Sequence, residues 1–305
     1  MLDVLLKRFR AGDRLALARL LSLVSRGRQV DDILRALGPS RRPSRVVAVT
    51  GSGGVGKSTL IGKLIEVIRG GGQTVAVLAC DPQSPLSGGA LLGDRFRMPA
   101  RPDDGVYIRS LAAAAGRGAV ADHLGLMVQL LEAFGFDVVL IETAGAGQGD
   151  TSVRELADVV VLLLQPQTGD DLQWEKAGLL EVADLVVIHK ADLPGAENVE
   201  AQVRATLELS AARAVPVLRA SAKDGRGIDE LWAAVRACPP RRPPAAERGL
   251  GLLRSAQECL AFAFDRARAA DDPRLKELLT SYEKGILTPR QAADQLLRLL
   301  ATTAP

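Results

Sequence analysis

Short apolar runs recur along the middle of the chain, and stretches with helical spacing separate them. The runs are dense in valine, leucine and isoleucine without polar alternation, which is typical of strands buried on both faces. Strands that alternate with helices indicate a parallel sheet. The pattern therefore predicts an α/β fold with a doubly wound, mostly parallel sheet. The expected strands are residues 46–50, 74–80, 107–109, 137–141, 159–164, 185–188 and 215–218.

Helical patterns without such runs lie on both sides of this region. Leucines at helical spacing among basic residues predict an amphipathic helix pair over residues 1–43, which we favour over a nucleic-acid-binding arm. Proline-rich breaks at residues 38–43 and 239–244 mark boundaries. The expected organisation is a helical N-terminal arm (1–43), an α/β domain (44–238) and a C-terminal helical segment (245–305).

The C-terminal segment carries more leucines than a small helical hairpin can bury alone. We expect helices over residues 247–269, 273–284 and 289–301, with Thr288 as the N-cap of the last and Gln291 at its third position. Packing against the main domain or against a second subunit would cover the leucines.

Composition narrows the class of protein. The chain has 305 residues, of which 47% are apolar, enough for one large α/β core with helical attachments. No apolar run reaches the roughly 18 residues of a membrane span, and the N-terminus lacks the organisation of a secretory signal. We therefore expect a cytoplasmic protein with no membrane or nucleic-acid partner. The three cysteines lack C-x-x-C spacing and indicate neither a disulfide framework nor a zinc site.

A phosphate-binding loop follows the first apolar run. Its sequence, Gly-Ser-Gly-Gly-Val-Gly-Lys-Ser, fits the G-x-x-x-x-G-K-[ST] pattern in a strand-loop-helix context. Glycines let the backbone turn its N–H groups toward a polyphosphate, and the helix expected to begin at Lys57 adds its N-terminal dipole. Lys57 can reach the terminal phosphates, and the Ser58 hydroxyl can ligate Mg²⁺. The expected nucleotide-binding residues here are Gly51, Ser52, Gly53, Gly54, Val55, Gly56, Lys57, Ser58 and Thr59.

Acidic residues follow later runs, where ligands of open α/β sheets bind. Asp81 could orient an attacking water or hold Mg²⁺ through water, although it could also simply begin a turn. Asp94, in a glycine-rich segment, is a second candidate for Mg²⁺. Glu142 is the stronger acid candidate, because the fourth run leads directly into it. Gln148 could contact the attacking water in a segment that orders with triphosphate, unless that segment is a plain loop.

Two further strand ends point to the base of the nucleotide. The sequence His-Lys-Ala-Asp at residues 189–192 resembles the Asn-Lys-x-Asp motif of GTPases. The Asp192 carboxylate can accept two hydrogen bonds from guanine, a pair that adenine cannot offer, and Lys190 can lay its stem along the base. His189 departs from the motif and puts affinity and loop tethering in question. The Ser-Ala-Lys loop formed by Ser221, Ala222 and Lys223 resembles the one whose backbone N–H meets the guanine keto oxygen.

Together these motifs resemble those of the MeaB-type GTPases. These are chaperones of adenosylcobalamin-dependent acyl-CoA mutases such as methylmalonyl-CoA mutase, and an older name for the family is lysine, arginine and ornithine transport ATPases. The resemblance spans nearly the whole chain, including a C-terminal part that looks like the family's dimerising tail. The motifs that carry it are the phosphate loop, Asp81-Pro82, Leu92-Gly93-Asp94, residues 142–148 and residues 169–176.

The resemblance implies a homodimer that binds GTP and GDP with Mg²⁺. It further implies slow GTP hydrolysis that a mutase accelerates, and a role in gating cofactor delivery and protecting the mutase. By this resemblance the catalytic residues are Lys57, Asp81, Glu142 and Gln148. The metal site would comprise Ser58, Asp81, Asp94 and Glu142, and Asp170, Gln173 and Lys176 would couple mutase binding to hydrolysis. Gly53 stands where relatives commonly have proline, which predicts a somewhat weaker nucleotide site.

Two other functions compete with this hypothesis. A kinase or transport ATPase, as the older family name suggests, would pass phosphate to a second substrate, but the sequence shows no second substrate pocket. A nickel-insertion GTPase would need clustered histidine and cysteine ligands. The chain has only two histidines and three scattered cysteines, which argues against that function.

Overall fold

The computed structural model describes residues 2–37, 44–82, 105–113, 123–143, 153–154, 156–166, 180, 182–209, 214–240 and 245–302. The chain divides into two compact units, Met1–Arg242 and Pro243–Pro305, and each is described by itself.

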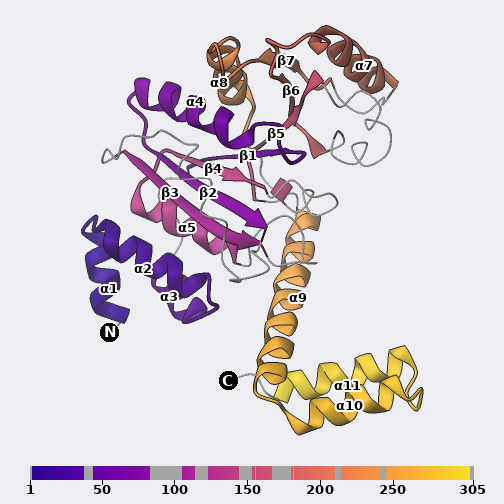
Figure 1. The fold of residues 1–305 in the computed structure, drawn as a ribbon. Helices are drawn as coiled ribbons and strands as arrows, with labels where there is room; N and C mark the ends of the chain where they lie inside the picture. Colours follow the sequence, from indigo (N-terminus) through magenta and orange to yellow (C-terminus); the bar gives the residue numbers. More distant parts are fainter. Residues whose placement is uncertain are drawn as a thin grey trace. The chain divides into compact units, whose positions relative to one another are not determined.

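The first unit is built on a seven-stranded sheet with the order β3-β2-β4-β1-β5-β6-β7 (Figure 1). Every neighbouring pair is parallel, which confirms the predicted fold class. The edge strand β3 is longer than predicted, because it pairs with β2 from Val75↔Val106 to Pro82↔Ala113. The strands are β1 Arg45–Gly51, β2 Val75–Pro82, β3 Val106–Ala113, β4 Val138–Glu142, β5 Val159–Leu164, β6 Leu185–His189 and β7 Val217–Ala220.

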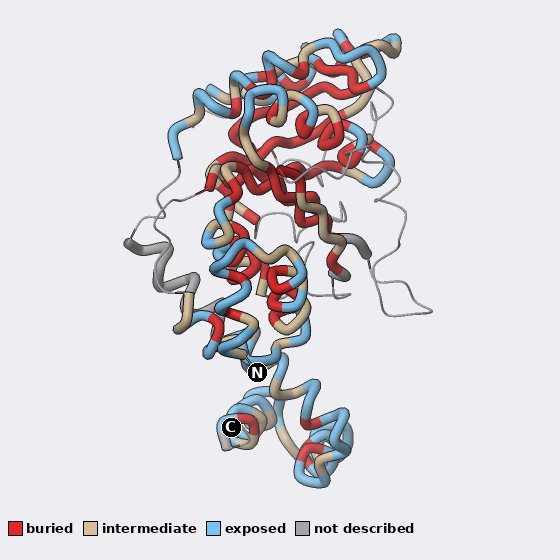
Figure 2. Tube along the Cα trace, turned by 90° about the vertical axis from the view of Figure 1, so that its left-hand side faces the viewer, coloured by how far each residue is buried: buried red, intermediate tan, exposed pale blue. Residues whose placement is uncertain are grey.

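Helices cover both faces of the sheet, because alternate strand residues point to opposite sides. Val47 and Val49 of β1 pack in the cluster formed with α4 (Lys57–Gly70) and α8 (Ile228–Ala237). Val46 and Ala48 pack on the other side with α5 (Leu124–Phe134) and the N-terminal helices. On that second side, α7 (Ala196–Leu209) covers β5, β6 and β7. Figure 2 shows the buried residues concentrated in the strands and on the inner faces of these helices.

The described part of the N-terminal arm contains three helices: α1 Leu2–Arg10, α2 Arg14–Val24 and α3 Val30–Leu37. The predicted helix pair is confirmed by α1 and α2, but α3 was not predicted. Gly27 and Gln29 have positive φ values of 62° and 54°, which break the helical path between α2 and α3. The leucines of α2 are fully buried at positions 17, 20 and 21, and Arg109 of β3 donates hydrogen bonds to the Ala18 carbonyl (3.3 Å) and to the Ser22 hydroxyl (3.0 Å). The arm thus packs on the sheet domain.

Aspartates that directly precede β4, β5 and β6 align the N-terminal ends of neighbouring strands. Each carboxylate accepts a hydrogen bond from a backbone N–H at the beginning of an adjacent strand. This fixes the register of the strands, and with it the positions of their C-terminal ends, where the site lies. The pairs are Asp137 with Thr74 (2.8 Å), Asp158 with Val46 (2.9 Å) and Asp184 with Val160 (2.9 Å).

The second unit consists of α9 Ala245–Ala269, α10 Pro273–Glu283 and α11 Pro289–Thr302. The predicted capping box is confirmed: the Gln291 N–H donates to the Thr288 hydroxyl (3.3 Å), and the Thr288 N–H donates to the Gln291 side chain (3.0 Å). The small core holds few buried side chains among the described residues, and large apolar ones stay exposed within this unit. These are Phe262, Leu279, Tyr282, Ile286 and Leu297.

No described helix is both long and apolar enough to cross a membrane.

Candidate functional site

The phosphate loop leaves the C-terminal end of β1 at the centre of the sheet, and three of its glycines are required by geometry. Gly51, Gly54 and Gly56 have φ values of 146°, 75° and 100°, which other residues rarely adopt. A Cβ on Gly51 would lie 2.6 Å from the Leu163 carbonyl oxygen, so the neighbouring strand also excludes a side chain. Gly53 has no positive φ, and a Cβ placed on it would meet no atom within 4 Å, so the geometry of the loop does not require glycine there.

The side chains at the start of α4 face the loop and the end of β4. The helix begins at Lys57, as predicted. The Lys57 ammonium donates to the carbonyl oxygens of Gly51 (2.8 Å) and Ser52 (3.2 Å). The Ser58 hydroxyl donates to a carboxylate oxygen of Glu142 (2.8 Å), and both side chains are buried. The fold thus brings together a serine and an acid that lie 84 residues apart in the sequence. Thr59 is exposed.

Ser58 and Glu142 form an oxygen-rich position that fits Mg²⁺, which prefers hydroxyl, carboxylate and water ligands. Their contact places two such donors side by side in a buried position beside the phosphate loop. Among the described residues, no group of three or more histidine, cysteine or acidic side chains could hold a metal by itself. Ser58 and Glu142 could supply two oxygen ligands of the ion, and phosphate and water oxygens could supply the others.

The predicted base-binding segments, residues 189–192 and 221–223, lie at the ends of β6 and β7. The Ser221 hydroxyl donates to Asp192 (2.8 Å), and the Lys223 ammonium lies 3.7 Å from the other carboxylate oxygen. The hydrogen bond from Ser221 lowers the pKa of Asp192, which keeps the carboxylate an ionised acceptor. The N–H of Ala222 makes no hydrogen bond within the described part of the chain. The two sequence motifs thus meet at one point.

Two residues of the predicted base-binding segments also contact the phosphate loop. Lys190 has a positive φ of 56°, and its ammonium donates to the Gly54 carbonyl (2.9 Å) and to the side chain of Gln165 (2.7 Å). A ring nitrogen of His189, Nδ1, lies 2.7 Å from the Val55 carbonyl oxygen. Gln165 is a residue that the sequence patterns did not single out. It directly follows β5, so inspecting the residue after each expected strand would have found it.

Several predicted residues lie outside the described part of the chain. Asp81 lies at the end of β2, where the backbone is described and the side chain is not. The others are Asp94, Gln148, Asp170, Gln173 and Lys176.

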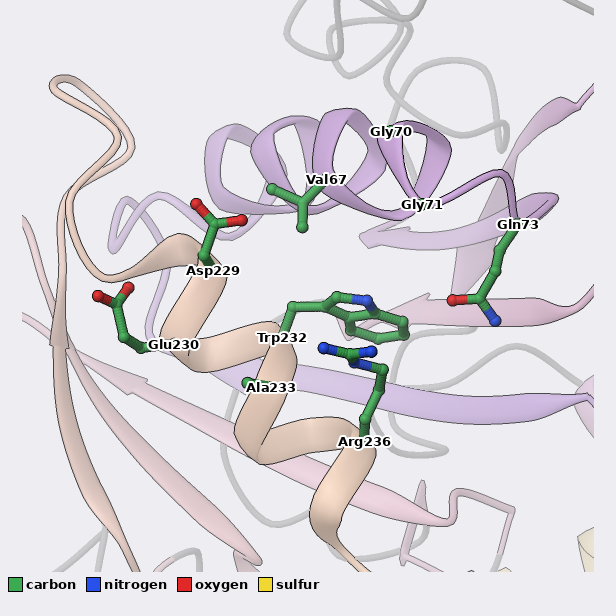
Figure 3. A pocket seen from close by; sticks show the side chains of 9 residues that line it. All are labelled: Val67, Gly70, Gly71, Gln73, Asp229, Glu230, Trp232, Ala233 and Arg236. Carbon is green, nitrogen blue, oxygen red and sulfur yellow. The ribbon is translucent and has the colours of Figure 1, made fainter.

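A surface hollow of about 700 Å³ lies elsewhere on the same unit, between the C-terminal end of α4 and α8 (Figure 3). Gly70 and Trp232 line it, and it lies at the end of α4 opposite Lys57, about 20 Å away along the helix. Its charged residues are Asp229 and Glu230 in the first turn of α8 and Arg236 in the last. Acids at a helix N-terminus and a base at its C-terminus complement the helix dipole. Their charges therefore need no ligand to explain them.

The chain matches known proteins over most of its length. The family model described as "Methylmalonyl Co-A mutase-associated GTPase MeaB" matches residues 17–241. A probable GTPase of Mycobacterium bovis is 37% identical over 329 aligned positions, which cover 99% of this chain and 96% of that protein. The mitochondrial methylmalonic aciduria type A homolog of Mus musculus is 39% identical over 198 residues, covering 62% of this chain and 48% of that protein. The crystal structure of a LAO/AO transport system kinase has a TM-score of 0.63 at 28% identity, covering 98% of this chain and 97% of that one.

Proposed function

Because this chain belongs to the MeaB family of GTPases, we propose that its GTP hydrolysis gates cofactor loading and protection of an adenosylcobalamin-dependent acyl-CoA mutase. The family description names methylmalonyl-CoA mutase as the associated enzyme, which supports a mutase of this class as the partner. The chain would act as a switch whose nucleotide state changes its contact with the mutase.

One observation carries the guanine specificity of this proposal: Ser221 and Lys223 hold the ionised Asp192, and His189 and Lys190 of the same segment contact the phosphate loop. An ionised carboxylate offers acceptors to the ring N–H and the amino group of guanine. The N–H of Ala222 makes no hydrogen bond within the described residues and would meet the guanine keto oxygen. Adenine would present an amino group to that N–H and would leave Asp192 without its pair of donors, so it should bind weakly.

The phosphate end would work through Lys57, Ser58 and Glu142. Lys57 binds the carbonyls of its own loop, and a polyphosphate would replace them as the stronger partner for the ammonium. When bound, Mg²⁺ would neutralise negative charge on the terminal phosphates. Ser58 and Glu142 would hold that ion, and Asp81, Asp94 and Gln148 remain proposed members of the metal and water site.

The C-terminal unit supports the proposal of a homodimer. Its exposed Phe262, Tyr282, Ile286 and Leu297 exceed what its small core can cover, and a second copy of the chain would bury them. Coupling to the mutase through Asp170, Gln173 and Lys176 is likewise part of the proposal.

Nucleotide binding tests the guanine site directly. The protein should bind GDP and GTP at least about 100-fold more tightly than ADP and ATP, because each hydrogen bond to a charged acceptor contributes about 1.5–3 kcal/mol. Asp192→Ala should remove most of that preference in calorimetry. Asp229→Ala removes an acid from the distant hollow and serves as the matched control, which should retain the preference for guanine nucleotides. Equal binding of guanine and adenine nucleotides by the unaltered protein would refute the proposal.

Turnover with candidate partners tests the chaperone role. GTP hydrolysis would be measured alone and with purified acyl-CoA mutases, each with and without adenosylcobalamin, and one mutase should accelerate it. If no mutase accelerates hydrolysis, the proposal of a mutase partner is refuted, while the GTPase activity itself is not.

A kinase is the second candidate function, because the structural relative is named a transport system kinase. A kinase would transfer the terminal phosphate to a substrate other than water. Radiolabelled GTP would follow that phosphate, and label that appears only in inorganic phosphate would exclude the kinase.

A further inference from the structure

His189 lies against the phosphate loop in a way that fixes its tautomer. Its Nδ1 is 2.7 Å from the Val55 carbonyl oxygen, which can only accept a hydrogen bond. Nδ1 must therefore carry the hydrogen. The ring also packs on Gly56, where a Cβ would lie 2.6 Å from Cε1 of the imidazole. His189 thus braces two successive residues of the phosphate loop.

The second nitrogen of this imidazole, Nε2, is buried and makes no hydrogen bond with the described residues. His189 is only 3% exposed, and its Nε2 has no hydrogen-bond partner within the described residues. Burial lowers the pKa of the imidazole below its ordinary value of 6.5, and the hydrogen bond with Val55 opposes this effect only in part. The ring is therefore neutral at neutral pH, with a bare acceptor at Nε2.

We propose that guanine-nucleotide binding draws a proton from solvent onto Nε2 of His189, so that nucleotide affinity is linked to pH through this one residue. The inference rests on the proposed function, since it requires a nucleotide on the loop that His189 braces. The uptake converts the neutral imidazole and one solvent proton into an imidazolium. Nδ1 keeps its hydrogen and its bond to Val55.

The charge of the nucleotide supplies the driving force. A loop of this kind holds the phosphates on its backbone N–H groups, so several negative charges would arrive beside a ring in a poorly solvated position. Negative charge close to an imidazole favours its protonated form. The nucleotide should therefore raise the pKa of His189.

The charged side chains near His189 have opposite effects on its protonation. Lys190 on the same segment disfavours protonation, and Asp192 favours it. Two further lysines lie on the segments in contact with these residues: Lys57 directly follows Gly56, on which the ring packs, and the Lys223 ammonium lies 3.7 Å from a carboxylate oxygen of Asp192. Asp192 already faces Lys223 without nucleotide, whereas the phosphates would newly neutralise part of the Lys57 charge, so nucleotide binding shifts the balance toward the imidazolium.

The sign of the linkage follows from the two states. If the nucleotide raises the pKa of His189, binding becomes tighter as the pH falls through the interval between the free and bound values. Each pH unit of that interval corresponds to about a tenfold gain in affinity at its acid end. An asparagine in this position, as in the common GTPase motif, could brace the loop but could not take up a proton.

Histidine NMR observes this proton directly. The chain has only two histidines, so a sample with ¹⁵N-labelled imidazoles gives two sets of signals, and His123→Gln assigns them. Titrations with and without GDP and Mg²⁺ should show an Nδ1–H tautomer that becomes doubly protonated at a higher pH when GDP is bound. A His189 midpoint that stays in place although GDP is bound would overturn the inference.

Calorimetry with a matched variant provides the second measurement. GDP binding near pH 6 would be recorded in buffers of different ionisation enthalpy, which gives the number of protons taken up. The terminal phosphate of the nucleotide itself titrates near this pH, at about 6, so His189→Asn serves as the reference. For each GDP bound, the unaltered protein should take up measurably more protons than the His189→Asn variant. Equal proton uptake by the two proteins would overturn the inference.

The outcomes separate the two proposals. Preferential GDP binding with no difference between the protein and His189→Asn would refute only the role of His189. Absence of GDP binding would refute the proposed function, and this inference with it. If His189→Asn does not fold, the NMR titration of the unaltered chain decides alone.

Discussion

The proposed phosphate end and the proposed base end of the site are built in different ways. The phosphate end depends on backbone geometry, with Gly51, Gly54 and Gly56 in conformations that other residues avoid. The base end depends on side chains from separate strand ends, namely Asp192 and Ser221. A backbone site tolerates almost no substitution at its glycines, whereas a side-chain site can change in steps. This difference predicts how strongly each end responds to mutation.

The largest effect is expected at Gly51. An alanine there would have to adopt a φ of 146°, and its Cβ would lie 2.6 Å from the Leu163 carbonyl oxygen. Relieving this clash would require a shift of the β5 backbone or of the phosphate loop. Gly51→Ala should lower the free energy of unfolding by about 3 kcal/mol and abolish nucleotide binding. Urea denaturation and GDP calorimetry measure both. Gly53→Ala is the matched control and should stay within about 0.5 kcal/mol, and equal losses in the two variants would contradict the comparison.

A smaller effect is expected at the base end. Ser221→Ala removes the hydrogen bond that holds Asp192 but leaves the carboxylate and Lys223 in place. GDP affinity should fall by roughly 5- to 10-fold, in line with about 1 kcal/mol for one hydrogen bond, while folding stability changes little. Titration with GDP and ADP tests this. A loss as complete as that of Asp192→Ala would mean that Ser221 contacts the base itself.

The stability of the nucleotide-free protein should depend on pH through His189. Burial lowers the pKa of this histidine in the folded state, so the unfolded chain binds the proton more readily. Its contribution to stability is present above the ordinary value of 6.5 and is lost as the pH falls from there through the folded-state pKa. Urea unfolding between about pH 7.5 and 5 should show a steeper decline for the unaltered protein than for His189→Gln. Parallel declines would contradict this prediction.

The smallest effect is expected at Gly53, the glycine that geometry does not require. A Cβ at this position would meet no atom within 4 Å, and a proline, which the family resemblance predicts here, would restrict the unfolded chain and the free loop. Gly53→Pro should tighten GDP binding by no more than about fivefold, since such substitutions contribute about 0.4–1 kcal/mol. GDP calorimetry measures the change, and unchanged affinity would dismiss the idea that Gly53 weakens the site.

Much of the fold follows from local patterns in the sequence. The buried strands, the helix that begins at Lys57 and the capping box at Thr288 all depend on residues close together in the chain. The third helix of the arm was missed because its break lies at Gly27 and Gln29, and a non-glycine residue with positive φ has no clear sequence signal. Likewise, the full length of β3 depends on pairing with β2 and not on its own composition.

The sequence by itself determined the phosphate loop, the parallel α/β class and the kinds of side chain available for guanine and Mg²⁺, because each depends on local spacing. Only the tertiary structure decided which distant residues meet. It joined Ser58 to Glu142, Asp192 to Ser221, and His189 to a carbonyl 134 residues away. Burial decides the protonation of His189, and burial is a property of the packed fold that no local pattern contains.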